Sequence, residues 1–192
     1  MRRVGLLGGT FDPPHVGHLV AAECARVELD LDEVRLLVAG DPWMKSTVST
    51  AEDRVALVRA AVDDHPGLAV DDREIRRGGP TYTAETLEEL RVEEPDVEWY
   101  FLVGQDAARS IPDWERGGDV LELARFVVLT RPGHEHDDAP ARIRELEHLM
   151  VPALAVSSTD LRRRYREGAA TRFQVPPAVD GLVRELGCYG VR

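Results

Sequence analysis

The chain has 192 residues, of which 43% are hydrophobic and 31% charged, and its formal net charge is −11. The length suits one substantial core, so we expect a single globular domain over residues 1–192. The acidic balance argues against a general nucleic-acid surface, which needs a basic face. No apolar run approaches the roughly 20 residues that span a bilayer, and the N-terminus enters a strand without a signal-peptide pattern, so we expect a cytoplasmic protein with no membrane partner.

The cysteines and the lysine set further bounds. Cys24 and Cys188 are far apart and form no metal or redox spacing, so we expect buried, reduced thiols. Lys45 is the single lysine among 24 Lys and Arg. An arginine bias of this kind follows genome composition, so Lys45 is either a chance survivor or a functional cation. Because the net charge is negative, an anionic ligand has to be held by local positive groups.

Apolar runs and helical patterns alternate along the chain. The runs that predict strands are 4–7, 34–39, 68–70, 99–103, 126–129 and 151–156. Between them, helices are predicted over 19–29, after Thr50 with Asp53, after a cap at Thr83, and from Ser157, whereas 76–80 is rich in turn residues. Strands that alternate with helices pair in parallel through crossover helices. The sequence therefore predicts one α/β domain, a doubly wound parallel sheet with helices on both faces.

The stretch from Gly8 to His18 joins the first predicted strand to the first predicted helix. Gly8 and Gly9 let the backbone approach a ligand, and free N–H groups at the start of a helix favour an anion. His15 and His18 are three residues apart, so if the first helical turn includes them they can point at one phosphate. The plainer alternative is a tight turn with histidines that cap or pack. The spacing is not Gly-x-Gly-x-x-Gly, which disfavours a dinucleotide fingerprint.

Ligands of a doubly wound sheet bind outside the carboxyl ends of its strands. The segments that follow the predicted strands are 8–18, 40–45, 104–106, 130–133 and 157–162. They supply the two histidines, Lys45, Arg131, Arg162, several glycines and the hydroxyls of Ser157, Ser158 and Thr159. Such a collection at one edge is what a polyphosphate site requires.

Two of these segments resemble a known family. His15-Val16-Gly17-His18 resembles the His-x-Gly-His signature of the nucleotidyltransferases, and the longer stretch from Gly8 is similar to the nicotinate-nucleotide adenylyltransferase branch. Ser157-Ser158-Thr159 with Arg162 resembles the second signature of that family, although a serine before a helix is also an ordinary N-cap. The resemblance implies a Rossmann-like fold. It also implies transfer of the adenylyl group of ATP to nicotinate mononucleotide, which gives nicotinate adenine dinucleotide and pyrophosphate.

The resemblance also implies roles for individual residues. The catalytic residues, all directed at phosphates, are His15, His18, Lys45 and Arg162. The residues implied to bind ATP are Gly8, Gly9, Thr10, Phe11, Gly104, Asp106, Arg131, Ser157, Ser158 and Thr159. Mg²⁺ is expected to bridge the ATP phosphates and to be held largely by substrate and water, because no aspartate cage is evident. The substrate phosphate attacks the α-phosphorus directly, so the protein mainly positions the two substrates and neutralises the charge of their phosphates.

The segments 80–87 and 104–106, with Trp114, are similar to family patterns that bind the second substrate. The resemblance assigns Thr83, Thr86 and Trp114 to nicotinate mononucleotide, and a tryptophan face can stack on a pyridinium cation. Without the family, Trp114 would be interpreted as core. Two departures from the pattern stand out. Glu115 replaces a frequent second aromatic residue, and 41–44 lacks the paired prolines and the histidine that commonly precede the basic residue.

Some alternatives remain at this level. The polar run from His134 to Asp138 looks like a metal cluster, but it follows a turn and precedes a proline, so we expect an exposed loop and no protein-held metal. Pantetheine-phosphate adenylyltransferase shares the histidine motif but is shorter and lacks the threonine and tryptophan patterns. A non-catalytic nucleotide-binding regulator would keep the glycines without needing paired histidines. A homo-oligomer stays possible.

Overall fold

The computed structural model describes residues 1–41, 47–132 and 140–191. Its six strands form one sheet in the order β3-β2-β1-β4-β5-β6, and every neighbouring pair is parallel. The strands are β1 Arg2–Gly9, β2 Glu33–Val38, β3 Leu68–Asp71, β4 Val97–Gly104, β5 Arg125–Thr130 and β6 Glu147–Met150. The predicted doubly wound parallel sheet is confirmed.

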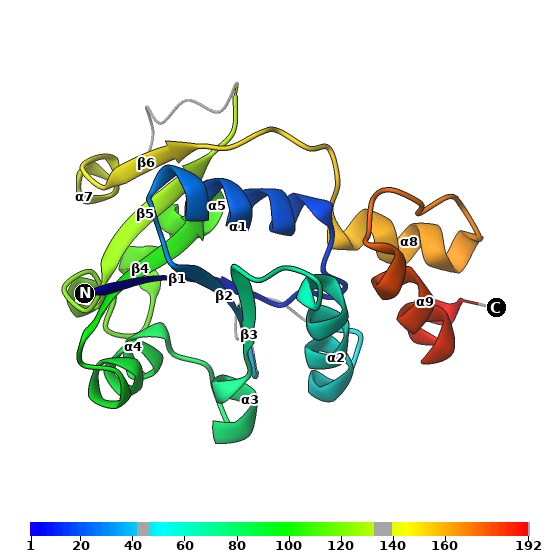
Figure 1. Cartoon of the computed structure of the whole chain (residues 1–192), viewed down its shortest axis with the longest axis horizontal. Helices are drawn as coiled ribbons and strands as arrows, with labels where there is room; N and C mark the ends of the chain where they lie inside the picture. Colours follow the sequence, from blue (N-terminus) through cyan, green and yellow to red (C-terminus); the bar gives the residue numbers. More distant parts are fainter. Residues whose placement is uncertain (42–46, 133–139, 192) are drawn as a thin grey trace.

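Helices cover both faces of the sheet, and α1 and α4 lie on opposite sides of the strands in Figure 1. They are α1 Val16–Glu28, α2 Ala51–Val62, α3 Arg73–Arg77, α4 Thr83–Glu93, α5 Gln105–Arg109, α6 Gly117–Val120, α7 Ala141–Arg144, α8 Ser158–Glu167 and α9 Pro177–Glu185. Two 3₁₀ turns, η1 Ile111–Asp113 and η2 Cys188–Gly190, complete the described elements. None of the helices in the described ranges is both long and apolar enough to cross a bilayer.

The two faces of the sheet carry separate cores, as the strand alternation requires. In β4, Trp99, Phe101 and Val103 pack with α4 to α7, whereas Tyr100 and Leu102 pack with α1, α2, α8 and α9. Successive side chains of a strand point to opposite faces, so a strand covered on both sides is apolar throughout. This is why the predicted strand over 99–103 is a continuous apolar run.

The caps predicted for two helices are confirmed. Thr50 Oγ1 accepts a hydrogen bond from the Asp53 N–H at 3.1 Å, and Ser157 Oγ accepts one from the Asp160 N–H at 3.2 Å. Helix α4 differs, because its N-cap is Tyr82, which makes no side-chain cap, and the expected cap Thr83 is the first helical residue. The backbone N–H groups at the start of α4 are therefore without a side-chain acceptor.

The sixth strand was predicted wrongly over 151–156. The strand is β6, which precedes that run, and 151–156 has no regular secondary structure. Only Val151 of the run is buried, and Pro152 has no N–H to donate to a ladder. Strand β6 lies at the sheet edge with Glu147 and His148 half-buried, so it lacks the apolar signal of an inner strand. The turn-rich stretch predicted over 76–80 also overlaps α3.

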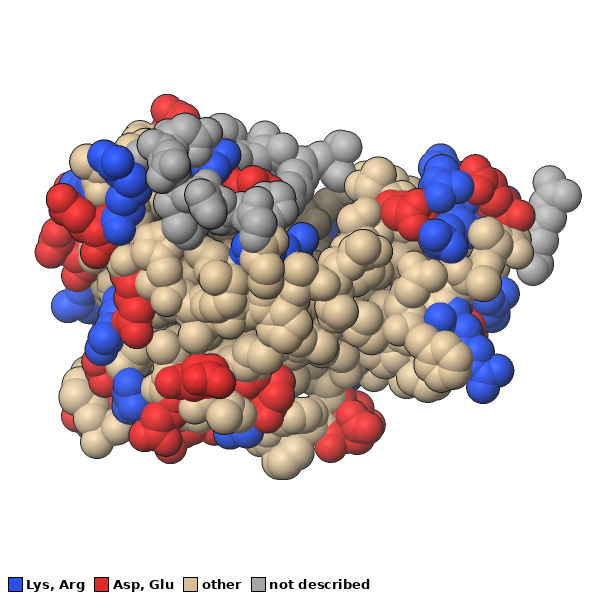
Figure 2. Space-filling model, turned by 90° about the horizontal axis from the view of Figure 1, so that it is seen from above, with Lys and Arg blue, Asp and Glu red and all other residues tan. Residues whose placement is uncertain are grey.

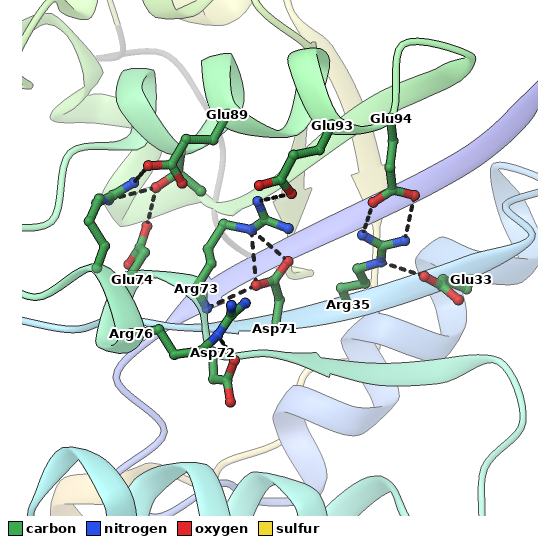
Figure 3. Close-up of polar contacts among 12 residues, drawn as sticks. Glu33, Arg35, Asp71, Asp72, Arg73, Glu74, Arg76, Glu89, Glu93 and Glu94 are labelled. Atoms are coloured by element: carbon green, nitrogen blue, oxygen red, sulfur yellow. Dashed lines mark hydrogen bonds and ion pairs between the residues drawn. The ribbon is translucent and has the colours of Figure 1, made fainter.

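Arginine–carboxylate pairs fasten α3 and α4 to the sheet (Figure 3). Arg35 of β2 binds Glu94 just after α4 at 3.0 Å, and Arg73 of α3 binds Glu93 of α4 at 2.9 Å. On the face seen in Figure 2, charged side chains gather at the margins, and mostly uncharged residues occupy the middle. The Arg35 and Arg73 pairs hold the C-terminal end of α4, because Glu93 is its last residue and Glu94 its C-cap.

Candidate active site

Two cavities lie at the carboxyl ends of the central strands. Chain order reverses between β1 and β4, and ligands of doubly wound sheets bind at such a switch point. The β2-side cavity has a volume of about 310 Å³, and the β5-side cavity about 290 Å³. Both are lined by Gly8, Gly104, Asp106 and Ala107. Two ligands bound in these cavities would therefore meet across a shared wall.

The β5-side cavity contains the first helix and the end of β5. Its walls include Gly17 and His18 of α1 and Arg131 just after β5, together with Val151, Pro152 and Leu154. Of the residues expected to bind ATP, Gly8, Gly104, Asp106 and Arg131 line this cavity. Arg131 is exposed, so its guanidinium can reach an anion there.

The two histidines of the motif are brought together at the start of α1. His15 is the N-cap residue and His18 lies in the first turn, with ring centroids 3.7 Å apart and planes at 19°. The His15 backbone N–H donates to His18 Nδ1 at 3.2 Å. Because Nδ1 accepts this bond, the neutral His18 ring carries its proton on Nε2. The spacing thus brings the two rings together, and their shared contact with a phosphate stays a prediction.

His15 is neutral at neutral pH. Burial, together with the positive charge of Arg131, lowers its pKa from 6.5 to about 4. The side chain is 5% exposed, and its Nδ1 is buried with no hydrogen-bond partner among the described residues. His15 can thus offer a phosphate a hydrogen bond but not a full charge.

Phe11 lies in the core and not in a cavity wall. It is 1% exposed, and its ring meets His18 edge-on with centroids 5.0 Å apart. A Cβ on Gly9 would come within 2.9 Å of this ring, so only glycine fits there. The Phe11 ring thus packs against His18, and the role of Phe11 in ATP binding stays a prediction. Gly9 and Thr10 line the β2-side cavity.

The second signature contacts the first directly. Ser158 Oγ donates to the Pro13 carbonyl at 2.8 Å, and Arg162 Nη1 donates to the Asp12 carbonyl at 2.8 Å. Arg162 Nη2 also donates to Thr159 Oγ1 at 3.2 Å. Ser157, Ser158, Thr159 and Arg162 line neither cavity and lie beside the motif.

The β2-side cavity contains the residues expected to hold a pyridine ring. Thr81, Tyr82 and Thr83 line it, as do Trp114 and Glu115. Trp114 is half-buried, its Nε1 donates to Ser110 Oγ at 2.9 Å, and its ring meets Phe101 edge-on. Trp114 therefore both packs against the core and faces the cavity, so the two interpretations of this residue are compatible.

Thr86 does not reach the β2-side cavity. It is fully buried, its hydroxyl donates to Glu74 Oε1 at 2.8 Å, and it accepts from Arg77 Nη2 at 3.0 Å. Its hydroxyl is hydrogen-bonded within the protein, and its expected contact with nicotinate mononucleotide stays a prediction. Glu74, which the sequence analysis missed, does line the cavity, and burial raises the pKa of its carboxyl. Figure 3 shows its polar contact.

Arg54 is a second residue that sequence reasoning missed. It is 1% exposed and donates to the carbonyls of Thr10 at 3.1 Å, Ala39 at 2.6 Å and Gly40 at 2.9 Å. These bonds join α2 to the carboxyl ends of β1 and β2 and leave a positive charge behind the cavities. The available signal was an arginine at helical spacing with the buried Val58 and Ala61.

Some predicted features fall outside the described residues. Lys45, the departures over 42–44 and the loop from His134 to Asp138 cannot be placed. Within the described ranges, no group of three or more His, Cys, Asp or Glu side chains could hold a metal ion. Cys24 and Cys188 are free thiols, Cys188 buried and Cys24 half-buried.

Comparison with known proteins gives a consistent picture. The Cytidylyltransferase-like family matches residues 6–164. A probable nicotinate-nucleotide adenylyltransferase of Nocardioides sp. is 45% identical over 188 residues, covering 95% of this chain and 90% of the relative. One of Synechococcus sp. is 40% identical, covering 98% of this chain and 95% of the relative. The Plasmodium falciparum nicotinic acid mononucleotide adenylyltransferase complexed with NaAD shares the fold at a TM-score of 0.82, 15% identity and coverage of 100% and 99%. The chain thus belongs to the nicotinate-nucleotide adenylyltransferase family, within the cytidylyltransferase-like nucleotidyltransferases.

Proposed function

We propose that the protein is an enzyme that transfers the adenylyl group of ATP to nicotinate mononucleotide and releases pyrophosphate. The observation that carries this proposal is the pair of cavities with a common wall at Gly8 and Gly104, next to the stacked histidines. The relatives named above carry this activity in their names. A P. falciparum structure with the same fold was solved with NaAD, the dinucleotide product.

The β2-side cavity suits nicotinate mononucleotide. Trp114 offers an aromatic ring for the pyridinium. Among the described residues that line this cavity there is no Lys or Arg, so a nicotinate carboxylate would be met by N–H groups and by hydroxyls such as that of Thr83. Helix α4 begins in the cavity wall and its first N–H groups lack a side-chain cap, which suits an anion. Glu115 in the same wall would limit how closely a second anion can approach.

The β5-side cavity suits ATP. Gly8 and Gly104 allow close approach of the backbone, and Arg131 supplies a charge at the cavity mouth. His18 lines this cavity as well, which suits a hydrogen bond to a phosphate. Arg162, beside the motif, and Lys45 are the further cations that we assign to the phosphates.

The chemistry requires positioning more than activation. The attacking phosphate monoester has a second pKa of about 6, so near neutral pH it is mostly a dianion with no proton to remove. The oxygen–phosphorus bond forms as the bond to pyrophosphate breaks, and no side chain need act as a general base. Hydrogen bonds from His15 and His18 stabilise the charge that builds on the transferring group.

Mg²⁺ is proposed as the metal that accompanies ATP. The described residues at the cavities offer single carboxylates, such as Asp106 on the shared wall, and no ready-made cage. This donor set fits an ion held mainly by phosphate oxygens and water, which would neutralise charge on the ATP phosphates.

A pyrophosphate-release assay tests the proposal. The protein is incubated with ATP and Mg²⁺ and with one acceptor at a time: nicotinate mononucleotide, nicotinamide mononucleotide or phosphopantetheine. We expect the fastest release with nicotinate mononucleotide, together with formation of the dinucleotide. Faster release with phosphopantetheine would reassign the substrate, and no release with any acceptor would favour a binding protein.

A further inference from the structure

Asp12, in the middle of the glycine-histidine motif, binds partners from distant parts of the chain. Its side chain is 1% exposed. One carboxylate oxygen accepts the hydroxyl of Tyr189 at 2.7 Å, and the other accepts the N–H groups of Val48 at 2.6 Å and Ser49 at 3.4 Å. The Asp12 carbonyl accepts Arg162 at 2.8 Å. One residue thus connects the motif, the chain just after 42–46, helix α8 and η2.

The C-terminal part of the chain holds the motif at several points. Besides the bond to Asp12, Ser158 Oγ donates to the Pro13 carbonyl at 2.8 Å, and the Val16 N–H donates to the Gln174 carbonyl at 3.0 Å. Residues 12–16 are therefore braced by α8, the loop before α9, and η2. Helices α8 and α9 lie together at this end of the molecule in Figure 1.

Tyr189 is built into this brace with a fixed role as donor. It is 6% exposed, and burial together with the Asp12 carboxylate raises the pKa of its hydroxyl, so the proton stays on the oxygen. Its φ of +60° lies in the left-handed region, which a tyrosine adopts only when its surroundings impose it. The Tyr189 hydroxyl therefore donates a hydrogen bond to the buried Asp12 carboxylate, and leaving this oxygen without a donor would be costly.

We propose that Tyr189 is a positioning residue for adenylyl transfer: through Asp12 it fixes the backbone of the motif on which His15 and His18 are mounted. The inference rests on the proposed function, because it concerns how that function's site is held. Tyr189 and its partner Asp12 are both buried and line neither cavity, so the hydroxyl does not touch a substrate bound there. Its effect should appear in the geometry of the reacting groups and not in the binding of either substrate.

The chain offers a matched control in Tyr165 of α8. The Tyr165 hydroxyl donates to Asp180 Oδ1 at 2.9 Å, its side chain is 2% exposed, and its ring stacks on that of Tyr189 at 5.8 Å. Tyr165→Phe and Tyr189→Phe thus each remove one hydroxyl that donates to a carboxylate, in the same part of the protein. Asp12, the partner of Tyr189, belongs to the glycine-histidine motif, whereas Asp180, the partner of Tyr165, does not.

The experiment compares kcat, both KM values and the thermal midpoint of the two variants with the wild-type protein. We expect both variants to lose a few degrees of thermal midpoint. Tyr189→Phe should also lower kcat about tenfold with both KM values within twofold of wild type, whereas Tyr165→Phe keeps a wild-type kcat. A normal kcat in Tyr189→Phe, or equal falls in kcat in both variants, would overturn the inference.

If Tyr189→Phe is too unstable to assay, Asp12→Asn alone should lower kcat with both KM values unchanged, and normal kinetics would overturn the inference. Where all variants fold, a double-mutant cycle tests the route through Asp12. Asp12→Asn keeps the shape of the acceptor but weakens the bond, so adding Tyr189→Phe to it should lower kcat by much less than tenfold. Independent, multiplicative effects would contradict a route through Asp12. If the wild-type protein itself makes no dinucleotide from ATP and nicotinate mononucleotide, the proposed function fails, which is a different outcome from an active enzyme that is insensitive to Tyr189.

Discussion

The charge state of His15 makes the stability of the folded protein depend on pH. Its pKa in the folded protein is about 4, against 6.5 for a free histidine, with burial as the main cause. Between these values the unfolded chain binds a proton that the folded protein does not. The free energy of unfolding therefore rises with pH across this window, and the contribution is lost as the pH falls through about 4.

Replacing this histidine should flatten that dependence. On lowering the pH from 7 to 4.5, His15 should cost the wild-type protein about 2 kcal/mol of stability, at 1.36 kcal/mol for each unit of pKa shift. His15→Asn, which cannot ionise, should lose less stability over the same range by about that amount. Urea unfolding at the two pH values measures it. If the free energy of unfolding depended equally on pH in both proteins, His15 would be protonated in the folded protein at pH 4.5, against this prediction.

Trp114 offers a test at the second substrate. Trp114→Ala removes the aromatic wall of the β2-side cavity, so it should raise KM for nicotinate mononucleotide about tenfold and leave KM for ATP nearly unchanged. The control is Trp99→Phe, since Trp99 is buried under Arg35 and lines neither cavity. Equal rises in both KM values for Trp114→Ala would indicate general damage to the core.

Helix α2 matters as an element because one arginine joins it to two strand ends. Arg54→Lys keeps a cation, but its single ammonium nitrogen cannot replace both Nη1 and Nη2, so it should lower the free energy of unfolding by about 2 kcal/mol. Arg59→Lys, on the exposed side of the same helix and paired with Asp72, should change it by less than about 0.5 kcal/mol. Denaturation curves for the two variants provide the measurement, and similar losses would remove the special role of Arg54.

The elements also show where sequence reasoning succeeds. Inner strands such as β4 are apolar on both faces, and helices such as α2 and α8 begin at a serine or threonine, so local patterns identify them. The edge strand β6 has no such pattern, and its recognition depends on β5, its partner. Thr83 and Thr86 both lie at the beginning of α4. The sequence alone does not show that Thr83 lines the cavity whereas Thr86 is buried in the core.

The candidate site divides in the same way. The glycines and histidines of the motif are close in sequence, so the sequence alone predicts that they lie near one another. Arg54, Glu74 and Tyr189 act through partners that are distant in sequence, such as Asp12 for Tyr189, 177 positions away. Pairings at such separation leave no periodic signal, so only the three-dimensional fold shows them.

For the molecule as a whole, the shared wall between the cavities favours direct transfer. If each cavity holds one substrate, as proposed, both substrates are bound at once and the reaction needs no covalent adenylyl-enzyme intermediate. Initial rates measured over a grid of both substrates should give intersecting reciprocal plots. Parallel plots, or label from ATP that stays covalently attached to the protein without an acceptor, would mean a two-step route.

The strand order also governs how the chain reaches its native state during synthesis. Strand β1 leaves the ribosome long before β4, with which it pairs from Arg2 opposite Val97 onward. Until then β2 can protect one side of β1, while the other keeps unpaired N–H and C=O groups. Parallel pairings at such separation form slowly, so the nascent chain carries an exposed, apolar strand edge for most of its translation. A fragment that stops before β4 is therefore expected to associate with other chains or with chaperones.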